Sequence, residues 1–205
     1  MRVLFQGDSV TDAKRDRSDP HQLGNGYPRF AAQMLYSQYP RVDWEFLNQG
    51  ISGNRTIDLC QRWQTDCLDY QPDVLSILVG VNDTLRRFDS NDPTAPAVLE
   101  QNYRFLLEKV KANTNAKIIM MEPFVLMTAA SREEWHADLD PKIAVIRKLA
   151  REYADVYIPL DGLFAALSVV REPKWWAADG VHPTEEGAFF IAQEYVKAIK
   201  EVLFL

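Results

Sequence analysis

Short apolar runs alternate with longer amphipathic stretches along most of the chain. Five of the short runs predict β-strands, at residues 3–6, 44–48, 74–79, 117–121 and 156–159. The third and fourth runs are almost continuously apolar, as expected of parallel strands that are covered on both faces. This alternation predicts an α/β protein, a three-layer α/β/α sandwich around a five-stranded, mostly parallel sheet.

The longer stretches repeat their apolar residues with the period of a helix. The last one begins after a proline, with Thr184 as its predicted N-cap and two glutamates in its first turn. A second helix is predicted at residues 141–153. The inward face of the last helix consists of Ala188, Ala192, Tyr195, Ile199 and Leu203.

Two segments between these elements are predicted to be long loops. Residues 13–26 are polar and charged, and residues 123–140 include Trp135 and His136. Loops of this length in compact domains tend to be functional. The chain has no internal repeat, low-complexity tract or linker, so its 205 residues predict one domain spanning 1–205.

Composition and charge narrow the classes of partner. The chain is 47% hydrophobic and 25% charged, with a formal net charge of −6 and no run of Lys or Arg. Nucleic acid and anionic membrane surfaces are therefore not expected partners. No apolar run reaches the roughly 20 residues of a membrane span, and no signal-peptide pattern follows Met1, which predicts a cytoplasmic protein.

The two cysteines agree with that compartment. Cys60 and Cys67 lie seven residues apart in one predicted helix, a rise of about 10 Å, which exceeds the reach of a disulfide. We therefore expect two reduced thiols, as is usual in the cytosol.

Polar residues follow three of the predicted strands. The segments 7–12, 49–54 and 80–83 are rich in Gly, Ser, Asn and Asp. Ligands of parallel α/β sheets bind at the carboxyl ends of the strands. These segments therefore predict the position of a functional site, and Ser9 in the first of them is a candidate nucleophile.

A nucleophilic serine requires a general base and a group that orients the base. The chain has three histidines, of which His21 and His136 lie in the predicted loops and His182 precedes the last helix. Asp179, three residues earlier, can fold back and hydrogen-bond one ring nitrogen of His182. Taken singly, this pair also fits a helix-entry hydrogen bond, and Ser9 also fits a turn or cap residue.

The three motifs taken together are more specific. Gly-Asp-Ser follows the first strand, Gly-x-Asn-Asp follows the third, and Asp-x-x-His-Pro stands near the end of the chain. This set resembles the GDSL or SGNH hydrolase superfamily of serine esterases, and the matching blocks span positions 7 to 183. The resemblance implies the SGNH hydrolase version of the flavodoxin-like α/β/α sandwich.

The resemblance also implies a role for each matching residue. Ser9 would be the nucleophile, His182 the general base and Asp179 the residue that orients it. The backbone N–H groups of Ser9 and Gly53, with the side-chain amide of Asn82, would form the oxyanion hole. We expect no metal and no other cofactor.

Several nearby residues have simpler interpretations. Asp8 and Asp12 flank the serine and are expected to stabilise turns, and Asp83 is expected to cap a helix. The pair Arg62 and Trp63 is expected to pack on a helix. Asn54 follows the oxyanion glycine and is a candidate substrate-binding residue.

One branch of the superfamily is more similar than the rest. Residues 48–54, 58–59, 62–63 and 79–83 resemble the bacterial carbohydrate acetylesterases, including acetyl xylan esterases. This implies acetylated xylo-oligosaccharides or other small esters as substrates, and a homo-oligomer. The tryptophan that this branch commonly has before the catalytic aspartate is Ala178 here. Trp175 and Trp176 stand slightly earlier and are expected to bind substrate.

Other functions remain open at this point. Within the esterases, a lysophospholipase, a thioesterase or a broad arylesterase is the main alternative. A metal-dependent hydrolase would use Asp179 and His182 as ligands, but no third ligand is evident nearby. A carbohydrate-binding protein without catalytic activity would not need the complete set of nucleophile, base and oxyanion donors.

Overall fold

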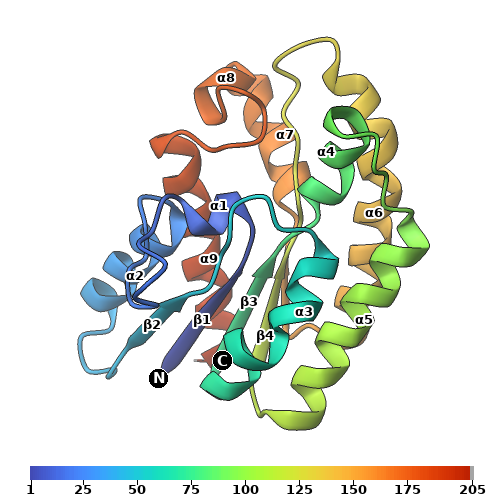
Figure 1. Cartoon of the computed structure of the whole chain (residues 1–205). Coiled ribbons are helices and arrows are strands. Elements are labelled where there is room, and N and C mark those ends of the chain that lie inside the picture. The colour runs from blue at the N-terminus through green and yellow to red at the C-terminus, as the bar shows by residue number, and fades with distance from the viewer. Residues whose placement is uncertain (204–205) are drawn as a thin grey trace.

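The computed structural model describes residues 1–203, and a sheet of five parallel strands forms its centre. Figure 1 shows this central sheet with helices around it. The sheet order is β2-β1-β3-β4-β5, which is the order of flavodoxin-like folds. Each predicted strand is confirmed to within one residue at either end. The strands are β1 (Arg2–Gly7), β2 (Glu45–Asn48), β3 (Val74–Leu78), β4 (Lys117–Met121) and β5 (Val156–Ile158).

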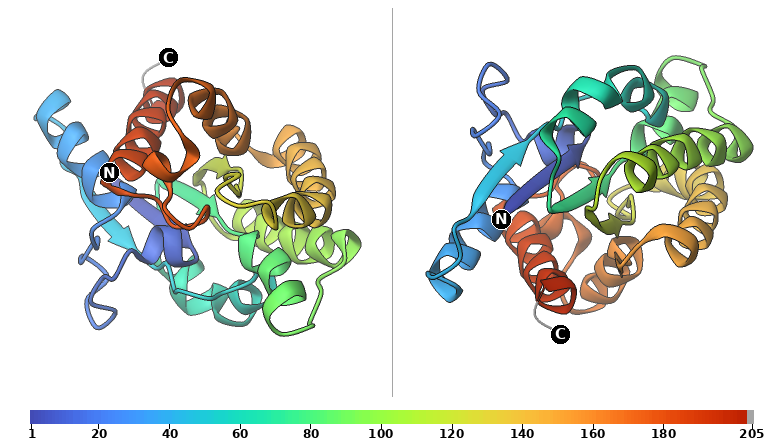
Figure 2. Two further views of the ribbon diagram at one scale, coloured as in Figure 1. Left: turned by 90° about the horizontal axis from the view of Figure 1, so that it is seen from above. Right: turned by 90° about the horizontal axis from the view of Figure 1, so that it is seen from below.

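Helices cover both faces of the sheet, which confirms the three-layer sandwich (Figure 2). On one face lie α2 (Tyr27–Gln38), α7 (Leu160–Val170) and α9 (Glu185–Leu203). The opposite face carries α3 (Thr56–Asp66), α5 (Pro96–Asn113) and α6 (Arg132–Tyr153). Shorter helices stand at the strand ends and connections: α1 (Ser9–Asp12), η1 (Leu68–Tyr70), α4 (Val81–Asp89) and α8 (Pro173–Trp176).

The alternation of side chains along a strand explains why the sheet needs both layers. Val3 and Phe5 of β1 are fully buried in the core beneath α2 and α9, whereas Leu4 between them is fully buried in the core beneath α3 and α5. Successive side chains of a strand point to opposite faces. A strand that is apolar at every position therefore requires a helical layer on each side.

The start of α9 agrees with the sequence expectation. The backbone N–H of Gly187 donates to the Thr184 side-chain oxygen at 3.2 Å, so Thr184 caps the helix as predicted. Gly187 also allows a close approach, because a Cβ there would lie 2.1 Å from the carbonyl oxygen of Trp176. The connection from α8 is thereby held against the N-terminus of α9.

The predicted loop at residues 123–140 is wrong in its second half. Helix α6 begins at Arg132, nine residues before the predicted start, and Pro141 lies inside it. Trp135, Leu139 and Ile143 follow one another at four-residue spacing and extend the apolar stripe of the helix, with Leu139 fully buried. This burial outweighs the cost of a proline in a helix interior. The other predicted loop, 13–26, contains no helix or strand.

Both Cys60, in α3, and Cys67, the residue after α3, are free thiols as predicted. Burial raises the pKa of both thiols, to about 11 for Cys60. Within residues 1–203 no helix has the length and apolar character needed to cross a membrane.

Candidate active site

Ser9 is presented at the carboxyl end of β1, where the strand turns directly into α1. Asp8 is the N-cap of this short helix, and its carboxylate accepts the backbone N–H of Val10 at 3.0 Å. Gly7 makes the turn possible, because a Cβ at this position would lie 2.3 Å from the carbonyl oxygen of Leu78. The local sequence therefore fixes Ser9 at the edge of the sheet where ligands bind.

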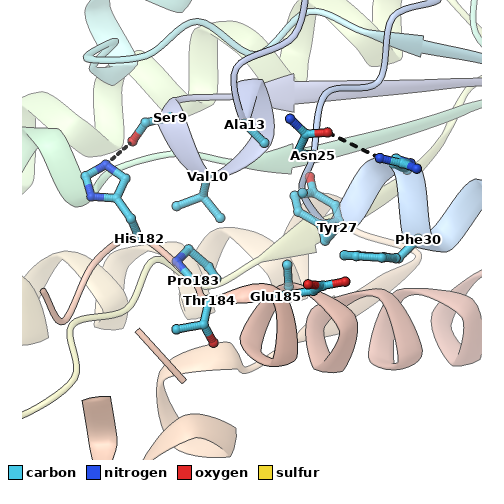
Figure 3. A pocket seen from close by; sticks show the side chains of 13 residues that line it. Ser9, Val10, Ala13, Asn25, Tyr27, Phe30, His182, Pro183, Thr184 and Glu185 are labelled. Carbon is cyan, nitrogen blue, oxygen red and sulfur yellow. Dashed lines mark hydrogen bonds between the residues drawn. The ribbon is translucent and has the colours of Figure 1, made fainter. Parts of the chain in front are cut away.

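His182 and Asp179 meet Ser9 as the sequence predicted. The Ser9 Oγ lies 2.9 Å from His182 Nε2 (Figure 3), and His182 Nδ1 lies 2.7 Å from Asp179 Oδ2. The other carboxylate oxygen of Asp179 accepts the backbone N–H groups of Val181, at 2.9 Å, and His182, at 2.8 Å. One short turn thus holds both the candidate base and the candidate residue that orients it.

Gly180 is required inside this turn. Its φ of +90° lies in a region that favours glycine, and a Cβ there would lie 2.6 Å from the carbonyl oxygen of Leu126. Leu126 in turn donates its backbone N–H to the carbonyl of Gly180 at 2.8 Å. The segment that follows β4 therefore supports the turn from Asp179 to His182.

Two carboxyl groups near Ser9 have shifted pKa values in opposite directions. Burial raises the pKa of Asp8 to about 7, although the N–H of Val10 and the positive charge of His182 oppose this rise. Burial would also raise the pKa of Asp179, but the hydrogen bonds from the side chain and backbone of His182 lower it below its ordinary value. Asp179 is therefore ionised at neutral pH and can stabilise a positive charge on His182.

The candidate oxyanion donors lie on the neighbouring strand connections. Gly53 follows β2 with a φ of +85°, and Asn82 lies in the first turn of α4 and is almost completely buried. The Asn82 side-chain nitrogen donates to the backbone oxygen of Asn54 at 3.0 Å. Asp83 caps a helix as expected, and it does so for α3, because its carboxylate accepts the N–H of Thr56 at 3.0 Å.

The segment that carries Gly53 is fastened directly to the segment that carries Ser9. The backbone N–H of Ile51 donates to the carbonyl of Gly7 at 3.1 Å, and Asp12 accepts both the N–H and the hydroxyl of Ser52. The close packing leaves no room for a side chain at Gly50, since a Cβ would lie 2.4 Å from the nitrogen of Asp12. Asp12 therefore stabilises the loops of the site, in agreement with its expected role.

Arg62 has a role that its helical position did not reveal. Its guanidinium donates to Asn54 Oδ1 at 2.9 Å and to the carbonyl of Gln49 at 2.8 Å, while Trp63 is buried as expected. Arg62 thereby fixes the segment from Gln49 to Asn54, and it engages the side chain of the candidate substrate residue Asn54. No pattern of hydrophobicity could have shown these contacts, because they join α3 to a loop.

A pocket of about 450 Å³ opens beside Ser9 and His182. Its walls come from the 13–26 loop, the start of α2 and the start of α9 (Figure 3). Ala13, Asn25, Phe30 and Glu185 are among the lining residues. The predicted functional loop therefore contributes to the cavity, whose volume suits a small-molecule ligand.

Trp175 and Trp176 do not line the pocket at Ser9. They line a second pocket of about 570 Å³, which shares Phe30 and Glu185 with the pocket at Ser9. Ala178 is exposed at the position where a tryptophan was expected from the resemblance.

The other two histidines bond to other groups. His21 contacts Asp19, and His136 lies between the carbonyl of Val125 and the carboxylate of Asp140. Among residues 1–203, no cluster of three or more His, Cys, Asp or Glu side chains is arranged to hold a metal ion.

The serine hydrolases have this arrangement, in which a serine is hydrogen-bonded to a histidine and the histidine to a carboxylate. The family within this class follows from comparison with known sequences. The sequence profile of the GDSL-like lipase/acylhydrolase family matches residues 5–188. The chain belongs to this family and is a carboxylic ester hydrolase.

The similarity to individual known proteins extends over almost the whole chain. An acetylxylan esterase from Geobacillus stearothermophilus is 29% identical over 97% of this chain and 93% of its own, and its crystal structure superimposes with a TM-score of 0.89. A structure from Parabacteroides merdae, described as a GDSL-like lipase, is 35% identical over 98% of this chain and 95% of its own, with a TM-score of 0.93. Thioesterase 1/protease 1/lysophospholipase L1 of Escherichia coli is 27% identical over 88% of this chain and 81% of its own.

Proposed function

We propose that the protein is a serine esterase that removes acetyl groups from acetylated carbohydrates such as xylo-oligosaccharides. The observation that carries the proposal is the continuous hydrogen-bonded chain from Ser9 through His182 to Asp179. The Geobacillus relative is an acetylxylan esterase, and two of its solved structures are catalytic mutants in which a serine or a histidine is replaced by alanine.

In the first half of the reaction, the acetyl group moves from the sugar to the enzyme. His182 Nε2 takes the proton of the Ser9 hydroxyl while Oγ attacks the ester carbonyl carbon. The tetrahedral intermediate then collapses, the bond to the sugar oxygen breaks, and His182 returns the proton to that oxygen. The products are a free sugar hydroxyl and an acetyl-enzyme on Ser9.

Water completes the cycle by the same route. His182 takes a proton from a water molecule, the hydroxide oxygen bonds to the acetyl carbon, and the bond to Ser9 Oγ breaks with return of the proton. Asp179 keeps the proton of His182 on Nδ1 throughout, and it stabilises the imidazolium that exists between the two transfers. Acetate leaves and the enzyme is regenerated.

The negative charge on the carbonyl oxygen requires donors that are already in place. We assign this role to the backbone N–H groups of Ser9 and Gly53 and to the amide of Asn82. An amide nitrogen carries two hydrogens. Because Asn82 uses one of them for the carbonyl of Asn54, its orientation is fixed and the other is available for the oxyanion.

The proposed substrate is tested with a series of esters whose acyl chains differ in length. Each buried methylene contributes about 0.8 kcal/mol, so an enzyme with an extended acyl groove should gain kcat/KM as the chain lengthens. We expect this enzyme to prefer acetyl to butyryl to octanoyl esters, and to release acetate from peracetylated xylose. The E. coli relative, a thioesterase and lysophospholipase, makes long acyl chains the second candidate. Faster turnover of octanoyl esters with no release of acetate from sugars would favour that candidate.

A further inference from the structure

A second pocket lies next to the one that contains Ser9, and we call it the aromatic pocket. It is formed where α8 packs on α9, and Phe30 of α2 completes it. Its volume is about 570 Å³. Its aromatic lining residues are Phe30, Trp175, Trp176, Phe189 and Phe190.

Two of these rings are held at the surface with a large part of each exposed. Trp175 is 40% exposed and Phe189 is 44% exposed. The guanidinium of Arg171 lies 4.0 Å above the centre of the Trp175 ring, which fixes the indole and covers one of its faces. Phe189 is held edge-to-face against Phe30, with ring centres 5.8 Å apart. The rings are therefore ordered by the protein while part of their apolar surface stays accessible.

Polar groups of the same pocket indicate the chemistry of its ligand. The polar residues Glu185, Glu186 and Gln193 also line it. A fatty acyl chain has no group that could hydrogen-bond to these side chains, and any of them that it covered would lose its water without a replacement. A pyranose ring instead offers an apolar C–H face to an aromatic ring and hydroxyl groups to carboxylates and amides. This combination of groups fits a sugar.

The aromatic pocket shares walls with the pocket beside Ser9 and His182, which we call the catalytic pocket. Phe30 and Glu185 line both cavities, and Figure 3 shows their side chains next to each other on the side of the catalytic pocket formed by α2 and α9. A ligand longer than one sugar that is bound at Ser9 would extend past these two residues. We infer that the aromatic pocket binds the sugar unit adjacent to the acetylated one, so that the enzyme recognises oligosaccharides. This inference rests on the proposed function.

The test compares a substrate that is long enough to reach the aromatic pocket with one that is not. Trp175→Ala and Phe189→Ala are assayed on acetylated xylotriose and on p-nitrophenyl acetate. Loss of one ring contact is expected to lower kcat/KM for the trisaccharide about tenfold more than kcat/KM for the nitrophenyl ester. Trp175→Phe keeps an aromatic face and should retain most of the preference. The control is Phe105→Ala on α5, which removes a phenylalanine that is 42% exposed and lies outside both pockets.

The possible outcomes separate this inference from the proposed function. If wild-type enzyme cleaves acetylated xylotriose but the variants lose activity equally on both substrates, the aromatic pocket is not a sugar subsite, and the proposed function still stands. If wild-type enzyme cleaves only the nitrophenyl ester, both fail. Light scattering after size exclusion is measured for every variant, because a change of oligomeric state with equal loss on both substrates would show that this surface binds a second copy of the chain.

Discussion

His182 and His136 each have an aspartate beside one ring nitrogen, but the groups beside their other ring nitrogen differ. Each ring places Nδ1 near an aspartate oxygen, at 2.7 Å from Asp179 for His182 and at 3.0 Å from Asp140 for His136. The difference lies at Nε2, which faces the Ser9 hydroxyl at 2.9 Å in one case and the carbonyl of Val125 at 2.6 Å in the other.

The partner of Nε2 decides what each histidine can do. A carbonyl oxygen only accepts hydrogen bonds, so Nε2 of His136 must carry a proton and cannot act as a base. A hydroxyl can donate, so neutral His182 can keep its proton on Nδ1 and offer a lone pair to Ser9. A histidine beside an aspartate is therefore not by itself a catalytic pair. The group on the far nitrogen makes it one.

The largest expected effect comes from removing the Ser9 hydroxyl, which faces His182 and has no counterpart at His136. Ser9→Ala should lower kcat on p-nitrophenyl acetate by roughly 10⁴-fold or more, because no nucleophile remains for His182 to activate. The fold should survive, which the melting temperature reports. Turnover close to that of wild type in pure protein would exclude the serine mechanism.

The two histidines can be compared directly by the same substitution. His182→Ala should lower kcat by about 10⁴-fold, since it removes the general base, whereas His136→Ala should leave most of the activity. Steady-state kinetics on a nitrophenyl ester measure both. Equal losses in the two variants would mean that His182 is not the general base.

Replacing Asn82 tests whether stabilisation of the negative carbonyl oxygen can be lost while proton transfer by His182 remains. Asn82→Ala should lower kcat by on the order of 10²-fold, with a smaller change in KM, because its amide is most important when the carbonyl oxygen is negative. Asn102→Ala is a matched control: Asn102 is also buried, and it donates to the Thr56 hydroxyl behind the site. A defect in Asn82→Ala that appears mainly in KM would indicate ground-state binding instead.

Features that depend on local patterns could be predicted from the sequence. The central strands β3 and β4 were found because both of their faces are buried, and the Asp179 to His182 turn was found because its bonds are local in sequence. Pro141 misled the prediction of α6, because its local preference is opposed by the burial of Leu139 and Ile143.

Contacts between distant segments could not be predicted from local patterns. Arg62 holds the loop from Gln49 to Asn54, and Trp175 faces the aromatic pocket rather than the pocket at Ser9. The contact of His136 with Val125 also joins distant segments. Val125 precedes Leu126, which donates its backbone N–H to Gly180 in the turn from Asp179 to His182. Hydrophobic periodicity carries no information about such pairs.

The smallest expected effect concerns stability at His136. Burial would lower the pKa of His136, but the hydrogen bonds to Asp140 and Val125 outweigh it and raise the pKa above its ordinary value. The folded state thus binds the proton more tightly than the unfolded chain, so the stabilisation is complete below the unfolded pKa of about 6.5 and is lost as the pH rises through the folded value. His136→Asn should therefore lower the melting temperature by roughly 2–4 °C at pH 5.5, if about 1 kcal/mol is lost. The deficit should shrink at pH 9. His21→Asn is the control, because His21 is exposed on the 13–26 loop. A deficit in His136→Asn that is the same at both pH values would show that this ring stabilises the loop after β4 by packing alone, without its charge.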